Sequence, residues 1–519
     1  MVVGNYLGRR ELYSPDTIAI ADHGKSPELR LSFREMNGRA NRLAGWLRDE
    51  AGVGKGDRVS ILARDGVEHF DVYYACGKLG AIHVPLNWRL HPQELLQLVE
   101  KTTPRVLVYE EEFRSAVEGM SAGLPPGAPA LERLLHLDGA GLRGSTPFPD
   151  VVAGPPVGAV ACDTLDPEDP ACILFTGGTT GLPKAVLISH RMIVWNVLNT
   201  VIHDLTHDDV VLNVFPLFHA GGLFCYWSSQ VVLGNTTIQV RKFDPEQVLD
   251  LIERESVTVF AGVPSMYRLL TQAPNWDRAD LSSLRFCTSG GAPLPVTLIE
   301  KYVREKGVRF KQGFGMTEFG PGVFALAAED AVRKAGSIGR PNFFVDARAV
   351  DEGNCSVGPG VVGELVLKGP SMCSGYFGDP QATAELVDAQ GYFHTGDLVT
   401  CDSEGYFTVV GRKKDMFISG GENVYPVEIE EALYRHPAVA TCAVVGVLDP
   451  KWGEVGAACV VLKTGHTVTE EEILRFLGGQ LARYKIPKRV VFMEALPLSG
   501  MGKPLKDELR TGLIEGRIG

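Results

Sequence analysis

The chain has 519 residues and a formal net charge of −12, so it offers no overall positive charge for nucleic acid or for an anionic membrane surface. Hydrophobic residues make up 45% of the chain, yet no stretch approaches the roughly 18 apolar residues that a membrane-spanning helix requires. The N-terminal segment also lacks the apolar centre of a secretory signal. We therefore expect a globular cytoplasmic protein with no transmembrane segment and no nucleic-acid partner.

The ten cysteines are scattered along the chain, without a Cys-x-x-Cys pair and without a Cys/His cluster at zinc spacing. We expect them to be reduced thiols, which agrees with a cytoplasmic location.

The N-terminal part alternates between predicted helices and strands. Ser32 and Glu35 have the spacing of a capping box, which predicts that a helix begins there. Short apolar runs then predict strands, and amphipathic runs between them predict helices: strands at 58–62, 81–85 and 105–109, and helices at 67–79 and 92–101. This alternation indicates a parallel, doubly wound α/β sheet.

The middle of the chain predicts a second α/β unit. Residues 122–170 are rich in Gly, Pro, Ala and Asp and predict a long surface connection. Residues 171–176 and 185–189 predict two strands joined by a Gly/Thr loop. Later strand-like runs alternate with helical patterns, at 210–215, 236–240 and 257–260. Residues 346–368 predict a smaller β subdomain.

The last hundred residues predict a small α+β domain. A helix is expected at 426–434, followed by strands near 439–447 and 455–462. A further helix is expected after the capping box of Thr469 and Glu472. We place the domain boundary in the charged run 411–415, which gives an N-terminal domain at 1–413 and a C-terminal domain at 414–519.

The loop at 175–184 reads FTGGTTGLPK and predicts a phosphate-binding site. Glycines let successive backbone N–H groups converge on an anion, while Thr179, Thr180 and Lys184 add donors and positive charge. The loop is not a Walker A motif, because Pro183 precedes the lysine and Ala185 follows it. Taken alone, the stretch is also compatible with a Gly/Thr hairpin that binds no ligand.

Four further stretches carry polar and glycine residues in ordered positions: QGFGMTE at 312–318, GYFHTGDL at 391–398, GRKKDMFISGGEN at 411–423 and LPLSGMGKPLK at 496–506. Together with the first loop, they resemble the motifs of the adenylate-forming superfamily, which includes acyl-CoA synthetases, coumarate-CoA ligases, peptide-synthetase adenylation domains and beetle luciferases. The resemblance runs from near residue 30 to near residue 510. It implies a large N-terminal domain of doubly wound α/β subdomains with a small β subdomain, followed by a small mobile α+β domain.

The resemblance implies a two-step reaction with ATP, Mg²⁺ and coenzyme A. A small-molecule carboxylic acid and MgATP give acyl-AMP and pyrophosphate, and the CoA thiol then displaces AMP to give a thioester. Attack of a carboxylate on a phosphate brings two anions together, so cations and aligned donors are required. The oligomeric state is left open, with a homodimer as one option.

Catalytic and ATP-binding roles follow from the same resemblance. It assigns Thr317 to the α-phosphate, Glu318 and Thr180 to Mg²⁺, and Phe314 to the adenine. The other residues that it places around ATP are Thr176, Gly177, Gly178, Thr179, Gly181, Lys184, Gly290, Gly291, Ala292, Gln312, Gly313, Gly315 and Met316. Outside the motif, Glu318 reads more simply as a solvated carboxylate and Phe314 as a core aromatic.

The C-terminal motifs contribute the remaining roles. In the family, Asp397 accepts hydrogen bonds from the ribose hydroxyls and Arg412 donates from the other side. Lys503 matches the mobile catalytic lysine that bridges the substrate carboxylate and the α-phosphate, and Lys414 matches the hinge. The face that replaces Lys503 for the CoA step consists of Gly420, Gly421, Glu422 and Asn423.

His219 matches the aromatic gate beside the acyl pocket, and we count it among the catalytic residues. Leu223, Trp227, Gly315 and Met316 are expected in the same apolar pocket. No acidic residue lies in 215–222, where amino-acid adenylation domains usually carry an Asp for the substrate amine, so an amino-acid substrate is disfavoured.

These features favour a CoA synthetase for a medium- or long-chain fatty acid. The alternatives are an aryl-acid CoA ligase, an acyl-AMP ligase that loads a carrier protein, and a catalytically silent nucleotide-binding protein. The joint presence of Glu318, Asp397, Arg412 and Lys503 argues against the last. Two positions depart from the family's T-S-G-T-T-G-x-P-K-G loop: Gly177 replaces Ser, which removes a phosphate donor, and Ala185 replaces the final Gly.

Overall fold

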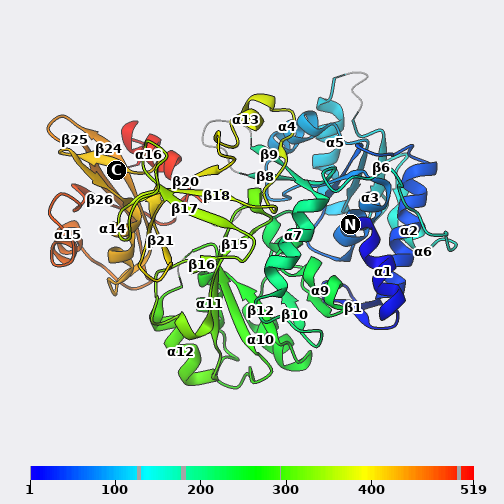
Figure 1. Cartoon of the computed structure of the whole chain (residues 1–519), viewed down its shortest axis with the longest axis horizontal. Coiled ribbons are helices and arrows are strands. Elements are labelled where there is room, and N and C mark those ends of the chain that lie inside the picture. Colours follow the sequence, from blue (N-terminus) through cyan, green and yellow to red (C-terminus); the bar gives the residue numbers. More distant parts are fainter. Residues whose placement is uncertain (1, 126–129, 177–182, 293, 499–503, 519) are drawn as a thin grey trace. The chain divides into compact units, whose positions relative to one another are not determined.

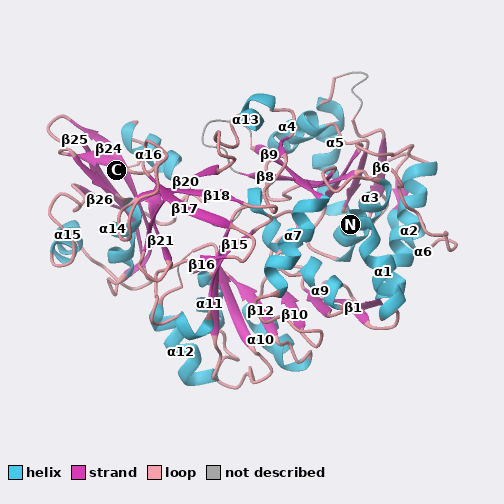
Figure 2. Ribbon diagram, viewed as in Figure 1, coloured by secondary structure: helices cyan, strands magenta, loops and turns pink. Residues whose placement is uncertain are grey.

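The computed structural model describes residues 2–125, 130–176, 183–292, 294–498 and 504–518. The chain forms two compact units (Figures 1 and 2). The first unit consists of Met1–Asp346 and Lys368–Gly391, and the second consists of Ala347–Leu367 and Tyr392–Gly519. The boundary expected at residues 413 and 414 lies inside the second unit, and its role as the limit of a mobile domain stays a prediction.

An eight-stranded sheet in the first unit has the order β19-β9-β8-β4-β3-β5-β6-β7. Its strands are β3 (Arg58–Leu62), β4 (Ile82–Pro85), β5 (Val106–Tyr109), β6 (Arg133–His136), β7 (Thr146–Pro147), β8 (Pro170–Thr176), β9 (Lys184–Ser189) and β19 (Gly375–Tyr376). Strands β3 to β8 pair in parallel, whereas β9 and β19 run antiparallel to their neighbours. The predicted doubly wound sheet is confirmed.

The first three helices of this sheet, which begin at residues 33, 67 and 92, begin where the sequence predicts. Ser32 caps α2 (Phe33–Asp49), and both hydrogen bonds of its capping box with Glu35 are present. Burial extends over nearly all of α3 (Val67–Leu79), because this helix packs beneath the sheet and also contacts α2. The remaining helices are α4 (Pro92–Thr102), α5 (Arg114–Gly123) and α6 (Phe148–Ala153).

The expectation of a long surface connection at 122–170 is wrong in part. Strands β6 and β7 and helix α6 lie within it. Leu135 and Phe148 are buried in the core formed by β3, β5 and α2. The apolar runs of β6, β7 and α6 are too short to show a helical or strand period in the sequence. The two strands form because β6 pairs with the edge of β5 and β7 pairs with β6.

A nine-stranded sheet has the order β16-β15-β14-β13-β12-β10-β11-β1-β2. Its strands are β1 (Ile18–Asp22), β2 (Leu29–Ser32), β10 (Val210–Asn213), β11 (Thr236–Gln239), β12 (Val259–Gly262), β13 (Phe286–Gly290), β14 (Phe310–Gly315), β15 (Gly322–Leu326) and β16 (Arg340–Pro341). Strands β1 and β10 to β14 pair in parallel, so their carboxyl ends meet at one edge.

Helices pack around this second sheet, and an aromatic cluster fills its core. Tyr267, Tyr302 and Phe310 meet edge to face, with ring centroids 4.8 to 5.8 Å apart. The helices are α7 (His190–Val201), α8 (Ala220–Phe224), α9 (Trp227–Leu233), α10 (Pro245–Arg254), α11 (Pro264–Leu270) and α12 (Val296–Lys306).

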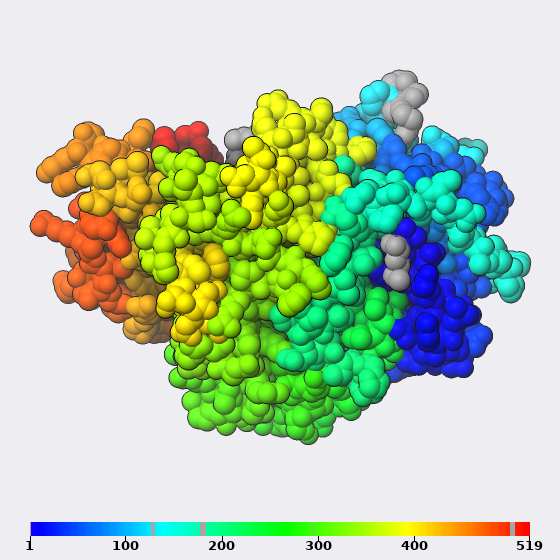
Figure 3. All heavy atoms as spheres, viewed as in Figure 1, coloured from blue at the N-terminus to red at the C-terminus, as the bar shows by residue number. Residues whose placement is uncertain are grey.

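The N-terminal helix α1 (Tyr6–Tyr13) lies at the surface of the first unit, in dark blue in Figure 3. It contacts α9, where Arg10 Nε donates to the Val231 carbonyl at 3.0 Å. This contact joins the start of the chain to the helices that follow His219.

The second unit has the predicted α+β character. One sheet contains β17 (Asp346–Val350), β18 (Gly363–Lys368), β20 (Phe393–Cys401) and β21 (Phe407–Arg412). The other contains β22 (Phe417–Ser419), β23 (Glu422–Val424), β24 (Val439–Asp449), β25 (Gly453–Leu462) and β26 (Arg489–Phe492), with α14 (Pro426–Tyr434), α15 (Glu470–Gly478) and α16 (Lys506–Ile514). Both hydrogen bonds of the Thr469 capping box are present, as predicted.

The ten cysteines are free thiols, as the sequence predicts. Among the helices of the described residues, none combines the length and the apolar character that crossing a membrane demands.

Candidate active site

The carboxyl ends of β13 and β14 form a glycine-lined edge in the first unit. Gly290 and Gly313 face each other in register, and a Cβ on Gly290 would lie 3.3 Å from the Gly313 carbonyl oxygen. Gly291 follows with φ +82°, a conformation that favours glycine. Ligands of open α/β sheets bind at the carboxyl ends of the strands. Gly290, Gly291 and the exposed Ala292 therefore lie where an adenine could contact the backbone.

The end of β14 is shaped by a register shift against β15, between Phe314 and Gly315. A Cβ on Gly315 would lie 1.8 Å from the Pro321 carbonyl oxygen, so only glycine fits there. Met316 N–H donates to that same oxygen at 3.0 Å. Half-buried Phe314 packs edge to face on Phe324, with centroids 5.8 Å apart.

Gln312 has a local partner that the sequence did not indicate. Its Oε1 accepts a hydrogen bond from Leu294 N–H at 3.1 Å. This bond ties the segment after β13 to β14, so Gln312 holds the glycine-lined edge in shape.

Three segments of the first unit converge around Glu318. Thr317 and Glu318 open the short 3₁₀ helix η3 (Thr317–Phe319), and the Glu318 carbonyl accepts from Cys373 N–H at 2.8 Å. Tyr376 of β19 is paired with β9 in register, and its hydroxyl lies 3.4 Å from Glu318 Oε1. Lys184 of β9 places its Nζ 4.7 Å from the Tyr376 ring centroid. Tyr376 thus lies between a cation and a carboxylate.

The electrostatics of this group keep Tyr376 a hydrogen-bond donor. Burial raises the pKa of the Tyr376 phenol far above its usual range, and the negative charge of Glu318 raises it further. The phenol therefore stays protonated. Carboxylate oxygens are hard donors of the kind that Mg²⁺ takes, so Glu318 fits this ion; Thr180, the other predicted ligand, lies outside the described residues.

Strands β20 and β21 of the second unit pair Asp397 with Arg412 in register. Arg412 Nε lies 2.7 Å from Asp397 Oδ1, an ion pair that the sequence did not indicate. Asp397 N–H donates to Thr395 Oγ1 at 3.0 Å, and Thr395 Oγ1 donates to the Leu365 carbonyl at 2.8 Å. The hairpin therefore holds the Asp397 carboxylate in one orientation, nearly buried beneath a half-exposed guanidinium.

The turn between β22 and β23 contains Gly420 and Gly421, with φ +61° and +89°. Gly420 is covered, because a Cβ there would lie 2.8 Å from the Trp452 ring. Gly421 is open, with no described atom within 4 Å of a Cβ built on it. Glu422 and Asn423 are exposed beside it. The proposed CoA face is thus an accessible hairpin turn.

Other predicted residues are placed singly or lie outside the description. Lys414 Nζ lies 3.7 Å from Asp507 Oδ2 in an exposed pair of the second unit. Thr176 ends β8, at the base of the predicted phosphate loop. The residues of the sequence prediction that lie outside the described residues are Gly177, Gly178, Thr179, Thr180, Gly181 and Lys503.

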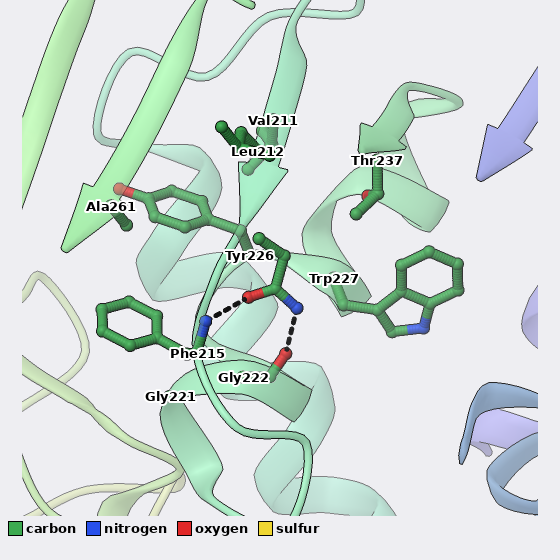
Figure 4. A pocket seen from close by; sticks show the side chains of 10 residues that line it. Val211, Leu212, Phe215, Gly221, Gly222, Tyr226, Trp227, Thr237 and Ala261 are labelled. Carbon is green, nitrogen blue, oxygen red and sulfur yellow. Dashed lines mark hydrogen bonds between the residues drawn. The ribbon is translucent and has the colours of Figure 1, made fainter. Parts of the chain in front are cut away.

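A small cavity lies between β10–β12 and the helices α8 and α9, beside residues 215–222 (Figure 4). His219 caps α8, with its Nδ1 accepting from Gly221 N–H at 3.1 Å. The cavity measures about 10 Å³, room for about one water, and its lining includes Phe215, Tyr226 and Trp227. The pocket is nearly filled by its own side chains.

The lining differs in part from the predicted set. Trp227 borders the cavity but is mainly a core residue, stacked on Phe70 at 3.9 Å and donating from Nε1 to Tyr74 Oη at 3.1 Å. Leu223 is buried, and it lies outside the cavity lining, as do Gly315 and Met316. An apolar side chain in sequence does not reveal whether it faces a cavity or the core.

The polar groups that border this cavity were not predicted from the sequence. Asn213 donates from Nδ2 to the Gly222 carbonyl and to Gln239 Oε1, at 3.2 and 3.1 Å. Tyr226 Oη lies 2.7 Å from Thr288 Oγ1. The lining of this cavity contains no acidic side chain. The pocket is therefore neutral, with aromatic walls.

Comparison with known proteins places this geometry in a family. The family model for AMP-binding enzymes matches residues 9–377. The family model for the C-terminal domain of AMP-binding enzymes matches residues 428–503. The chain belongs to the AMP-binding enzymes of the adenylate-forming superfamily. Within this family it is an acid–CoA ligase, and the expected α/β architecture with a small C-terminal domain is confirmed.

Several relatives match over almost their whole length. The chain is 41% identical to a feruloyl-CoA synthase of Amycolatopsis sp., 38% to an indoleacetate–CoA ligase of Aromatoleum aromaticum and 36% to a long-chain-fatty-acid–CoA ligase of Mycobacterium tuberculosis, each over 98% of both chains.

Two solved structures are similar throughout. ATP-bound MatB from Rhodopseudomonas palustris has a TM-score of 0.88 at 32% identity, covering 98% of this chain and 99% of its own. MenE from Bacillus subtilis in complex with ATP and magnesium ion has a TM-score of 0.85 at 28% identity, covering 97% and 99%.

We predict that Gly315→Ala destabilises the first unit. The new methyl group would collide with the Pro321 carbonyl. This carbonyl cannot move freely, because Pro321 directly precedes β15, which is paired with β14. Overpacking of this kind typically costs about 1–3 kcal/mol. The measurement is the midpoint of thermal unfolding.

Gly313→Ala is the matched control, because a Cβ there would meet its nearest atom only at 3.9 Å. Equal midpoints for the two variants would contradict the close approach at Gly315.

Proposed function

We propose that this enzyme is an AMP-forming CoA ligase for an aryl acid of the arylpropenoate or arylacetate class. The observation that carries the proposal is the neutral pocket walled by Phe215, Tyr226 and Trp227. Planar aromatic walls favour a planar acid. The polar groups of Asn213 and Tyr226 are bonded within the protein and hold these walls in place. The feruloyl-CoA and indoleacetate–CoA relatives support the same class.

The first half-reaction joins the acid to AMP. A carboxylate oxygen attacks the α-phosphorus, a C(O)–O–P bond forms, and pyrophosphate leaves with the electron pair of the broken P–O bond. In our proposal Thr317 donates to an α-phosphate oxygen, and Lys184 adds positive charge beside the phosphates. The glycine-lined edge at Gly290 and Gly313 admits the adenine.

Glu318 would hold Mg²⁺, which supplies charge neutralisation on the phosphates when bound. Tyr376 Oη lies 3.4 Å from Glu318 Oε1, so the phenol would help to orient the carboxylate that holds the ion. Asp397 would accept from the ribose hydroxyls, and its ion pair with Arg412 orients the carboxylate.

The second half-reaction transfers the acyl group to CoA. The thiolate attacks the acyl carbonyl carbon, a C–S bond forms, and AMP leaves. We propose that the open turn at Gly421 lies against the CoA arm in this step, and that rotation about Lys414 exchanges this turn for Lys503. Free cysteines support a reducing, cytoplasmic compartment for this chemistry.

A fatty acid is the second candidate substrate. The 36% identical long-chain-fatty-acid–CoA ligase supports it, as does the apolar composition of α8 and α9. Either kind of acid is larger than the 10 Å³ cavity, so the side chains around it would have to move for both. Transfer to a carrier-protein thiol in place of CoA is separated from CoA ligation by a direct assay for acyl-CoA.

A substrate screen tests the proposal. Cinnamates, arylacetates, benzoates and fatty acids of graded length are each incubated with ATP, Mg²⁺ and CoA, with pyrophosphate release and acyl-CoA mass as readouts. We expect the highest kcat/KM for a substituted cinnamate or an arylacetate. A higher kcat/KM for a long-chain fatty acid would overturn the aryl assignment. Formation of acyl-AMP without acyl-CoA would overturn CoA as the acceptor.

We predict that Asp397→Ala raises the KM for ATP by about 10- to 100-fold, because hydrogen bonds to a charged group contribute roughly 1.5–3 kcal/mol. Asp351→Ala is the control: Asp351 lies in a hairpin of the same unit and accepts from Gly353 and Cys355 N–H groups. An unchanged KM for ATP in Asp397→Ala would remove Asp397 from the nucleotide site.

We predict that Lys503→Ala separates the half-reactions. Loss of its charge should slow acyl-AMP formation by roughly a hundredfold to a thousandfold, as is typical for an electrostatic contact to a developing anion. Thioester formation from supplied acyl-AMP and CoA should be nearly unchanged. Equal loss in both assays would contradict the alternation of domains.

A further inference from the structure

The segment 215–222, which leads into α8 and carries His219, is held by a residue from the other sheet. Asp65 lies three residues after the end of β3, and its Oδ1 accepts a hydrogen bond from Leu217 N–H at 2.7 Å. The Asp65 residue is only 5% exposed. A buried carboxylate of the eight-stranded sheet is thus bound to the backbone of a segment that borders the nine-stranded sheet.

A second contact fixes the neighbouring residue. The Arg89 guanidinium lies over the Phe218 ring, 5.3 Å from its centroid, and also over Trp88 at 4.5 Å. Arg64 covers the same Trp88 ring at 3.9 Å. Leu217 and Phe218 are therefore both held by residues that follow β3 and β4.

The segment is also braced internally, so one anchor positions all of it. His219 N–H donates to the Pro216 carbonyl at 3.1 Å, and Phe215 N–H donates to Asn213 Oδ1 at 3.2 Å. A Cβ on Gly222 would lie 2.3 Å from the Pro216 carbonyl oxygen. A shift at Leu217 would therefore move the pocket-lining Phe215 and the ring of His219 together.

We propose that Asp65 is a positioning residue that holds the segment 215–222, and through it the acid-binding pocket, in place. This inference rests on the proposed function, because it takes the cavity beside Phe215 as the acid site. Asp65 acts through the Leu217 amide and contacts no reacting atom. The expected signature is a change in the KM for the acid without a change in the KM for ATP.

The charge of Asp65 adds a pH dependence. Burial raises the pKa of this carboxyl to about 7; the Leu217 N–H, Arg89 and Arg64 oppose the increase, and Glu110 adds to it. The anion accepts a stronger hydrogen bond than the neutral acid does. The KM for the acid should therefore rise as the pH falls from about 8 to about 6, as Asp65 becomes protonated.

Kinetics of Asp65→Ala and Asp65→Asn test the proposal with the acid that the screen identifies. Asp65→Ala should raise the KM for the acid about tenfold and leave the KM for ATP within about twofold. Asp65→Asn, which keeps an acceptor oxygen but not the charge, should raise the KM for the acid by less than Asp65→Ala does. It should also lose the part of the pH dependence that Asp65 supplies.

Asp22→Ala is the matched control. Asp22 is buried in the same unit and accepts from Val67 and Gly24 N–H groups at 2.9 and 2.8 Å, neither of which belongs to the segment 215–222. This variant should lower the unfolding midpoint without changing the ratio of the two KM values. A similar ratio in the Asp65 and Asp22 variants would overturn the positioning role, as would a wild-type pH profile in Asp65→Asn.

Hydrogen exchange separates this inference from the proposed function, because it needs no substrate. In Asp65→Ala, or in Asp65→Asn if the alanine variant does not fold, the Leu217 amide should exchange at least about tenfold faster than in the wild type. Unchanged exchange in the folded variant would overturn the anchor. Absence of turnover for every acid in the screen, with faster exchange, would instead refute the proposed function.

Discussion

Pairing of β19 with the edge of β9 is the constraint on which the candidate active site depends. This two-residue strand lies almost two hundred residues after β9, and its register fixes Tyr376 beside Val186. From there the phenol reaches Glu318 while its ring faces Lys184. Without that edge contact, the glycines at the ends of β13 and β14 would still be in place. The Tyr376 side chain, however, would no longer lie between the Glu318 carboxylate and the Lys184 ammonium.

The local nature of this arrangement agrees with the charge of the chain. A molecule with a net charge of −12 repels a triphosphate at long range, so attraction must come from groups within a few ångströms. Lys184 provides one such cation, held over an aromatic ring, and backbone N–H groups at strand ends provide others without adding net charge. The second unit also adds no net charge at its predicted site, because the positive charge of Arg412 is paired with the negative charge of Asp397.

Features encoded by neighbouring residues were predictable from sequence. The capping boxes at Ser32 and Thr469 begin helices where expected, and the strand at 58–62 and the helix at 67–79 agree with prediction to the residue. The glycine-rich motifs also identified the superfamily correctly.

Contacts between distant segments were not predictable. Tyr376 beside Glu318, Asp65 beneath Leu217 and the ion pair of Asp397 with Arg412 join residues whose proximity depends on strand order or register. Trp227 shows the complementary limit. Its hydrophobicity placed it in a pocket, whereas stacking on Phe70 makes most of its ring part of the core.

The order of segments along the chain has a consequence for biosynthesis. The eight-stranded sheet is completed by β19, and residues 347–367 of the second unit are translated before that strand. More than two thirds of the polypeptide must therefore be synthesised before β19 can pair with the edge of β9. Until then β9 presents unpaired N–H and C=O groups, the kind of edge on which nascent chains associate. Chaperone dependence during translation should therefore be concentrated in the interval between the emergence of β9 and that of β19.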